Sequence, residues 1–123
     1  MRSPARDSVD AGAAGVMIAP TPALRTDDQI TGYFAQAVEA VGTDVPWVLQ
    51  DYPLTLSVVM SAGVIARIIN DHPSCLMLKH EDWPGLEKIS KLRKWEQEGS
   101  MKRISILCGN GGQFLDFEME RGV

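Results

Sequence analysis

One lysine stands where a sequence of this kind can carry covalent chemistry. Lys79 directly follows the apolar run Cys75 to Leu78, which has the length of a buried strand. We therefore expect Lys79 at the C-terminal end of a strand, the end at which parallel α/β barrels hold their active sites. Apolar neighbours disfavour the charged form of an amine, and a neutral amine can attack a carbonyl carbon to form a Schiff base. The alternative is a solvated lysine at the edge of a loop.

Polar residues also lie at the end of the preceding apolar run, Trp47 to Gln50. Gln50 ends that run, and Asp51 and Tyr52 follow it. We predict that Gln50 and Asp51 bind substrate, because they end a strand beside the presumed lysine strand. Tyr52 shares a face with Gln50, since side chains two residues apart in a strand point to the same side. It is a candidate for proton transfer, and the alternative is a rim tyrosine with its hydroxyl in water.

A glycine-rich loop, Gly109-Asn110-Gly111-Gly112, lies between an apolar run and a predicted helix. The backbone N–H groups of Gly109, Asn110 and Gly111 are candidates for binding a substrate carboxylate at the helix N-terminus. The alternative is a tight turn that needs positive φ angles. The loop matches neither the dinucleotide-binding nor the P-loop pattern, so we expect no nucleotide cofactor.

Three consecutive residues, His80, Glu81 and Asp82, have side chains that metal ions favour. Consecutive residues rarely converge on one ion, so we expect no metal site. We interpret the three as a polar loop that opens the next helix, whose positive end favours acidic residues.

The elements that position these residues follow from hydrophobic periodicity. Apolar runs typical of buried parallel strands lie at Val16 to Ala19, Trp47 to Gln50, Cys75 to Leu78 and Ile104 to Leu107. Helical spacing predicts helices over about Asp27 to Val41, Ser57 to Asn70, Pro84 to Glu98 and Gln113 to Glu120. Such alternation is typical of a parallel α/β sheet.

The length of the chain limits the architecture. A complete (β/α)₈ TIM barrel takes about 250 residues, so four units in 123 residues make about half of one. We therefore predict one partial TIM-barrel domain over residues 1–123. A small flavodoxin-like sheet competes with it, but that fold begins with a strand and normally has about five.

Composition excludes several classes of protein. The net charge is −4, which argues against nucleic acid or an anionic membrane as the partner. No apolar run approaches the ~20 residues of a membrane span, and Met1 to Asp10 lack the apolar stretch of a signal peptide. Cys75 and Cys108 lie in apolar runs without a CxxC pattern, so we expect neither a disulfide framework nor a zinc site. A cytoplasmic protein fits best.

Three segments together resemble the dihydrodipicolinate synthase / N-acetylneuraminate lyase family of class I aldolases. These are Gln50 to Pro53, Leu76 to Lys79 and Leu107 to Gly112, and the resemblance extends over almost the whole chain. It implies a (β/α)₈ barrel of which the four apolar runs are strands four to seven. It also implies that Lys79 is the Schiff-base lysine and that the protein is a homo-oligomer.

The chain departs from the family pattern at several positions. With Pro53 aligned to the proline of the family's Tyr-Asn-x-Pro motif, Gln50 takes the place of the catalytic tyrosine and Asp51 that of the asparagine. Leu54 to Leu56 stand where the synthases carry an arginine for the substrate carboxylate, and Thr21-Pro22 replaces a tyrosine pair. These departures argue against dihydrodipicolinate synthase activity itself.

The sequence thus predicts a lyase of aldolase or dehydratase type that acts on a 2-oxo acid, such as pyruvate or a keto-deoxy sugar acid. Lys79 and Tyr52 are the predicted catalytic residues, and no cofactor is expected. One alternative is a truncated, catalytically inactive half barrel that acts only by self-association. A weaker one is a flavodoxin-like domain that holds a phosphate-bearing ligand on its glycine loop.

Overall fold

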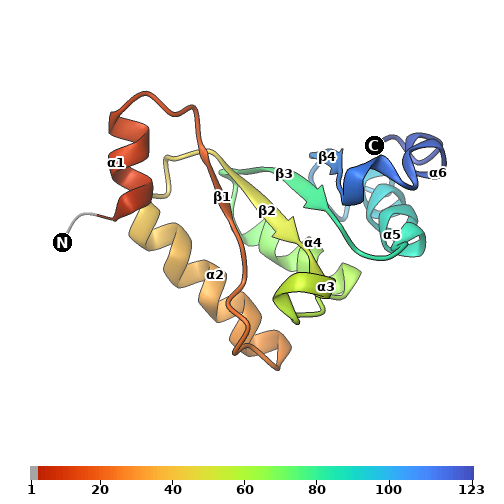
Figure 1. The fold of residues 1–123 in the computed structure, drawn as a ribbon, viewed down its shortest axis with the longest axis horizontal. Coiled ribbons are helices and arrows are strands. Elements are labelled where there is room, and N and C mark those ends of the chain that lie inside the picture. The colour runs from red at the N-terminus through yellow and green to blue at the C-terminus, as the bar shows by residue number, and fades with distance from the viewer. Residues whose placement is uncertain (1–2) are drawn as a thin grey trace.

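Helices and strands alternate along the chain in the computed structural model, which describes residues 3–123 (Figure 1). The elements are α1 (Pro4–Asp10), β1 (Val16–Ile18), α2 (Asp27–Val41), β2 (Trp47–Asp51), α3 (Pro53–Leu56), α4 (Ala62–Asp71), β3 (Cys75–His80), α5 (Leu86–Gln97), β4 (Ser105–Cys108), the 3₁₀ turn η1 (Asn110–Gly112) and α6 (Leu115–Met119). The expectation of a single domain also covered Met1 and Arg2, which lie outside the described residues.

The four strands form one parallel sheet in chain order, β1-β2-β3-β4. Parallel neighbours need crossover connections, and α2, α4 and α5 provide them. The predicted α/β architecture of four units, half of a TIM barrel, is thereby confirmed.

One face of the sheet and the three crossover helices enclose the core. The register aligns one buried residue from each strand, namely Ile18, Leu49, Leu78 and Ile106. Phe34 of α2 stacks on Trp47 of β2 with ring centroids 5.8 Å apart. The apolar stripes predicted for the helices therefore pack against the side of the sheet that carries this row.

The segment between β2 and α4 differs from the prediction. The sequence predicts one helix from Ser57, but the structure has a single turn, α3, and a new start at Ala62. Ser57 adopts a left-handed conformation with φ 57°, which ends α3. Ser61 then caps α4 by accepting a hydrogen bond from the Val64 amide at 3.2 Å.

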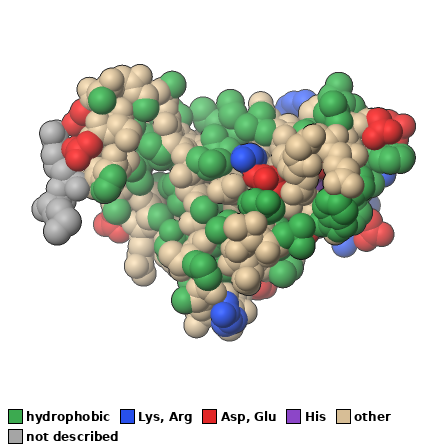
Figure 2. All heavy atoms as spheres, viewed as in Figure 1, with side chains coloured by type: hydrophobic (Ala, Val, Ile, Leu, Met, Phe, Trp, Pro, Cys, Tyr) green, Lys and Arg blue, Asp and Glu red, His purple; other side chains and the backbone are tan. Residues whose placement is uncertain are grey.

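The other face of the sheet is largely apolar, and none of the helices in residues 3–123 covers it. Met17 is 50% exposed, Met77 36% and Leu107 41%. A groove of about 470 Å³ runs over β1, β2 and β3 on this face. Figure 2 shows hydrophobic side chains across the part of the view that the strands occupy in Figure 1. In a complete barrel, side chains on such a face fill the interior, and we call it the open face.

None of the helices within residues 3–123 is both long enough and apolar enough to span a membrane.

Candidate functional site

Lys79 lies on the open face, next to last in β3. The register places it between Gln50 of β2 and Leu107 of β4. Its side chain is 34% exposed. The amine therefore reaches the C-terminal edge of the sheet, where the sequence predicts it.

The Lys79 amine forms an ion pair with the buried carboxylate of Glu81. Lys79 Nζ lies 2.7 Å from Glu81 Oε1, and the Gln50 amide donates to the same oxygen at 3.2 Å. The backbone N–H of Asn110 also donates to the Glu81 carboxylate. Burial disfavours the charged form of Glu81, but these hydrogen bonds outweigh it and hold the pKa of Glu81 below its ordinary value. Glu81 is thus an ionised carboxylate that links β2, β3 and the loop after β4.

The backbone shows why Glu81 lies there. Its amide donates to the Asp51 carbonyl at 2.8 Å and so extends the pairing of β3 with β2 beyond the strand end. The Gly109 amide donates to the His80 carbonyl at 2.9 Å, which brings the loop beside Glu81. A Cβ at Gly109 would lie 2.0 Å from Glu81 Cγ. Gly109 is therefore needed because of the close approach of Glu81.

The rest of the loop has the conformation of a tight turn. Asn110, Gly111 and Gly112 have φ angles of 51°, 64° and 74°. The Asn110 side chain donates to the Asp82 carbonyl at 3.2 Å and anchors the turn to the segment after β3. The positive φ angles agree with the turn interpretation. The backbone N–H of Asn110 binds the Glu81 carboxylate of the protein itself.

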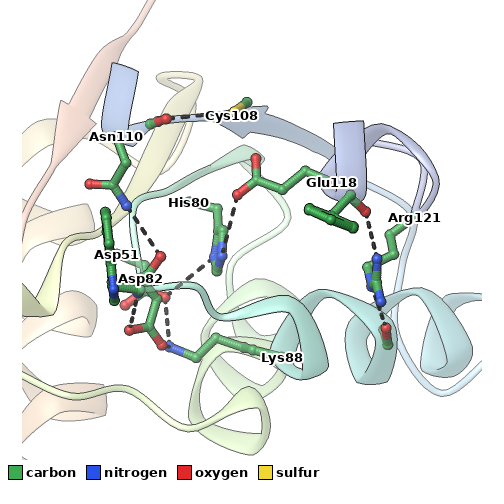
Figure 3. A network of polar contacts seen from close by, with 12 residues as sticks. Asp51, His80, Asp82, Lys88, Cys108, Asn110, Glu118 and Arg121 are labelled. Carbon is green, nitrogen blue, oxygen red and sulfur yellow. Dashed lines mark hydrogen bonds and ion pairs between the residues drawn. The ribbon is translucent and has the colours of Figure 1, made fainter. Parts of the chain in front are cut away.

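Asp51 lies on the opposite side of the sheet from Lys79. It is fully buried in a row with His80 and Cys108, facing α5 and α6 (Figure 3). Lys88 of α5 lies 2.8 Å from Asp51 Oδ2 and 2.8 Å from Asp82 Oδ2. Burial raises the pKa of Asp51 despite the nearby lysine. The structure therefore does not bring Asp51 to the open face beside Lys79.

The interpretation of His80 to Asp82 as a polar loop is wrong for His80, whereas Glu81 and Asp82 lie in the segment between β3 and α5. His80 is the last residue of β3 and fully buried, and α5 begins only at Leu86. The His80 ring lies between two buried carboxylates, with Nδ1 3.8 Å from Asp51 and Nε2 4.0 Å from Glu118 (Figure 3). Hydrophobic periodicity does not detect such a group, because its buried residues are polar.

Tyr52 lies just outside β2. It is half-buried and precedes the short helix α3, and its carbonyl accepts a hydrogen bond from the Leu56 amide at 2.9 Å. Within residues 3–123 no hydrogen bond joins its hydroxyl to Lys79. The structure thus brings Lys79, Gln50 and Asn110 together around Glu81, which is not among the residues predicted to form the site. The Lys-x-Glu spacing was the available signal, because residues two apart share a strand face.

No protein-family model matches the chain, and no curated protein sequence matches it. Among solved structures, it is similar to a dihydrodipicolinate synthase from Rhodopseudomonas palustris, with 72% identity and a TM-score of 0.94 over 97% of this chain and 40% of that one. A lysine-bound dihydrodipicolinate synthase from Cyanidioschyzon merolae has 18% identity and a TM-score of 0.79, over 96% of this chain and 38% of that one.

A third similar structure is YagE from E. coli K12, a prophage protein of the same family in complex with pyruvate. It has 13% identity and a TM-score of 0.73, over 94% of this chain and 38% of that one. The second and third structures support the fold alone. The chain spans about 40% of the length of the Rhodopseudomonas palustris protein.

Proposed function

Because this chain shares the sequence and fold of the dihydrodipicolinate synthase family over the part of the barrel that it spans, we propose that it carries the Schiff-base lysine of an aldolase-type lyase. The predicted family resemblance is thereby confirmed, and the fold is of the aldolase and lyase type. The observation that carries the proposal is the position of Lys79, partly exposed at the C-terminal edge of the open face.

The proposed substrate is a 2-oxo acid. The neutral Lys79 amine attacks the 2-oxo carbon, and loss of water gives a protonated imine. This imine withdraws electrons more strongly than a ketone, so it stabilises the carbanion or enamine formed when a bond to the neighbouring carbon breaks. Pyruvate is the first candidate, since a protein of the same fold, YagE, has been solved in complex with it.

The residues around Lys79 receive proposed roles that follow from their places. Gln50 lies beside Lys79 on the open face, where its amide can orient a bound oxo acid. Gly111, an exposed residue of the turn, offers a backbone N–H for the substrate carboxylate, with Gly109 and Asn110 shaping the turn. Tyr52 remains the proposed proton-transfer group at the end of β2. Asp51 supports the strand end from the other face through Lys88.

Borohydride reduction tests this proposal, because it converts a transient imine into a stable secondary amine. The protein is incubated with pyruvate and with longer 2-oxo acids, reduced, and weighed by intact mass spectrometry. We expect a mass increase of one adduct in the wild type and in the control Lys91→Arg, which changes an exposed lysine of α5. Lys79→Arg should show none. An adduct of equal yield in Lys79→Arg would contradict the proposal.

A second candidate function is self-association without catalysis. The exposed Met17, Met77 and Leu107 on the open face favour it, because contiguous apolar surface marks contact with another protein surface. In this case the open face would serve only to hold a second copy of the chain, and Lys79 would take no adduct.

A further inference from the structure

The carboxylate beside Lys79 has no role in the chemistry described so far. Glu81 touches the nitrogen that would attack the substrate, at 2.7 Å. Only 7% of the residue is exposed, and its contacts come from three separate segments of the chain. A glycine at position 109 leaves the space that this side chain occupies.

The neighbouring amide strengthens the case for a chemical role. Gln50 stands where the resemblance places a catalytic tyrosine, yet an amide neither gives up nor accepts a proton at neutral pH. Its hydrogen bond goes to Glu81 Oε1, the oxygen that also contacts Lys79. Of the two side chains that contact each other here, only the carboxylate can accept a proton from the amine.

We propose that Glu81 is the catalytic base and acid that carries protons between the Lys79 nitrogen and the substrate oxygen during imine formation, with Gln50 as its positioning residue. This inference rests on the proposed function of Lys79. The contacts that hold Glu81 ionised also keep one carboxylate oxygen directed at the amine.

The proton balance of the step is complete without another reactant. Glu81 first takes a proton from the Lys79 ammonium, and the neutral amine attacks the 2-oxo carbon, whose C=O electron pair moves onto the oxygen. Glu81 returns the proton to that oxygen. It then takes a second proton from the new nitrogen centre and passes it to the hydroxyl group, which leaves as water when the nitrogen electron pair forms the C=N bond. Two protons have moved from nitrogen to oxygen, and Glu81 is again a carboxylate.

The test measures how fast Lys79 becomes trapped. The protein is mixed with pyruvate and saturating cyanoborohydride, and the Lys79 adduct is followed over time by peptide mass spectrometry. Glu81→Gln keeps an oxygen that can accept from Lys79 but cannot carry a proton, and we expect trapping to slow by about 100-fold. The exposed Glu87 of α5 supplies the matched control, Glu87→Gln, which should trap at the wild-type rate.

Two further readouts separate proton transfer from support of the structure. In Glu81→Ala, added formate should restore the trapping rate in proportion to its concentration, because a small carboxylate can take the vacated place. In the wild type, the rate should fall as the pH drops through the lowered pKa of Glu81, since the protonated acid is no longer a base. Glu81→Gln should lack this acid limb.

The outcomes distinguish the two proposals. If the wild type forms no adduct at Lys79, the proposed function fails and the role of Glu81 fails with it. If the wild type is trapped and a folded Glu81→Gln is trapped equally fast with the same pH profile, only the role of Glu81 is overturned.

Discussion

At the scale of single residues, strand alternation decides which side chains share a site. Gln50 and Asp51 are both predicted to bind substrate because they end a strand beside the lysine strand, but adjacent residues in a strand lie on opposite faces. The same rule links Lys79 to Glu81, but periodicity indicated a loop there and Glu81 was not selected. Lys79 and Gln50 could be found from sequence. The burial of Glu81 could not be predicted, because it depends on Gly109, which is distant along the chain.

Reactivity of the Cys108 thiol is expected to depend on Glu118. Burial raises the pKa of Cys108, and the Glu118 carboxylate adds to this by accepting a hydrogen bond and by repulsion, so that the pKa reaches about 11. Glu118→Gln should therefore lower this pKa and speed alkylation by iodoacetamide at pH 9, because only the thiolate reacts.

Cys75 provides the internal control for this measurement. Burial raises its pKa to about 11 as well, but Glu118 does not contribute to that shift. Peptide mass spectrometry resolves the two cysteines. Equal acceleration at Cys75 would mean that the substitution loosens the fold and that Glu118 has no specific effect on Cys108.

At the scale of elements, we expect the approach of the β4 loop to β3 to require a glycine at position 109. The Cβ of Gly109→Ala would overlap Glu81, so the substitution should lower the free energy of unfolding by about 2 kcal/mol. It should also displace Glu81 and slow trapping at Lys79.

Gly32→Ala is the matched control: it lies inside α2 with no atom within 4 Å of the added Cβ. It should raise stability by about 0.5–1 kcal/mol, measured by urea unfolding. Equal stability of the two variants would contradict the close packing of the loop.

Lys88 joins α5 to β2 and to the segment after β3. Its ammonium contacts Asp51, which is fully buried, so Lys88→Met removes the lysine that pairs with this carboxylate and leaves it beside the His80 ring, 3.8 Å away. We expect a loss of about 3 kcal/mol in the free energy of unfolding at pH 7. The loss should shrink as the pH falls, because the raised pKa of Asp51 lets it take up a proton and become neutral.

The double variant Asp51→Asn with Lys88→Met supplies the control. It removes both charges, so it should be more stable at pH 7 than Lys88→Met alone. If Lys88→Met proves as stable as the wild type across the pH range, the ion pair does not link α5 to the sheet.

At the scale of the whole molecule, the open face is expected to drive association of the chain. Met17 and Met77 are adjacent to the same Val48 position in the register and are both well exposed. Because such apolar surface is unfavourable in water, sedimentation should detect species heavier than the 13.5 kDa monomer. Met77→Ser should shift the equilibrium toward the monomer. Leu54→Ser, which changes a residue that is 64% exposed in α3, should not. A monomer at all concentrations would contradict this expectation.

Most of the architecture could be predicted from sequence, since its elements have strong periodic signals. The sequence predicts all four strands and α2 closely, and in the structure Thr26 caps the start of that helix and Gly42 follows its end. The break between α3 and α4 could not be predicted, because apolar spacing continues through Val58 and Met60, which are buried outside any helix. Local conformation at Ser57 decided the boundary there.

The central claim is that Lys79 forms an imine with a 2-oxo acid, and peptide mapping of the borohydride-reduced protein with pyruvate tests it most directly. Digestion after acidic residues leaves each lysine side chain free to carry the added mass. We expect the mass on the peptide that contains Lys79 and on none that contains Lys88, Lys91, Lys94 or Lys102. An adduct spread over the exposed lysines, or absent from Lys79, would contradict the account.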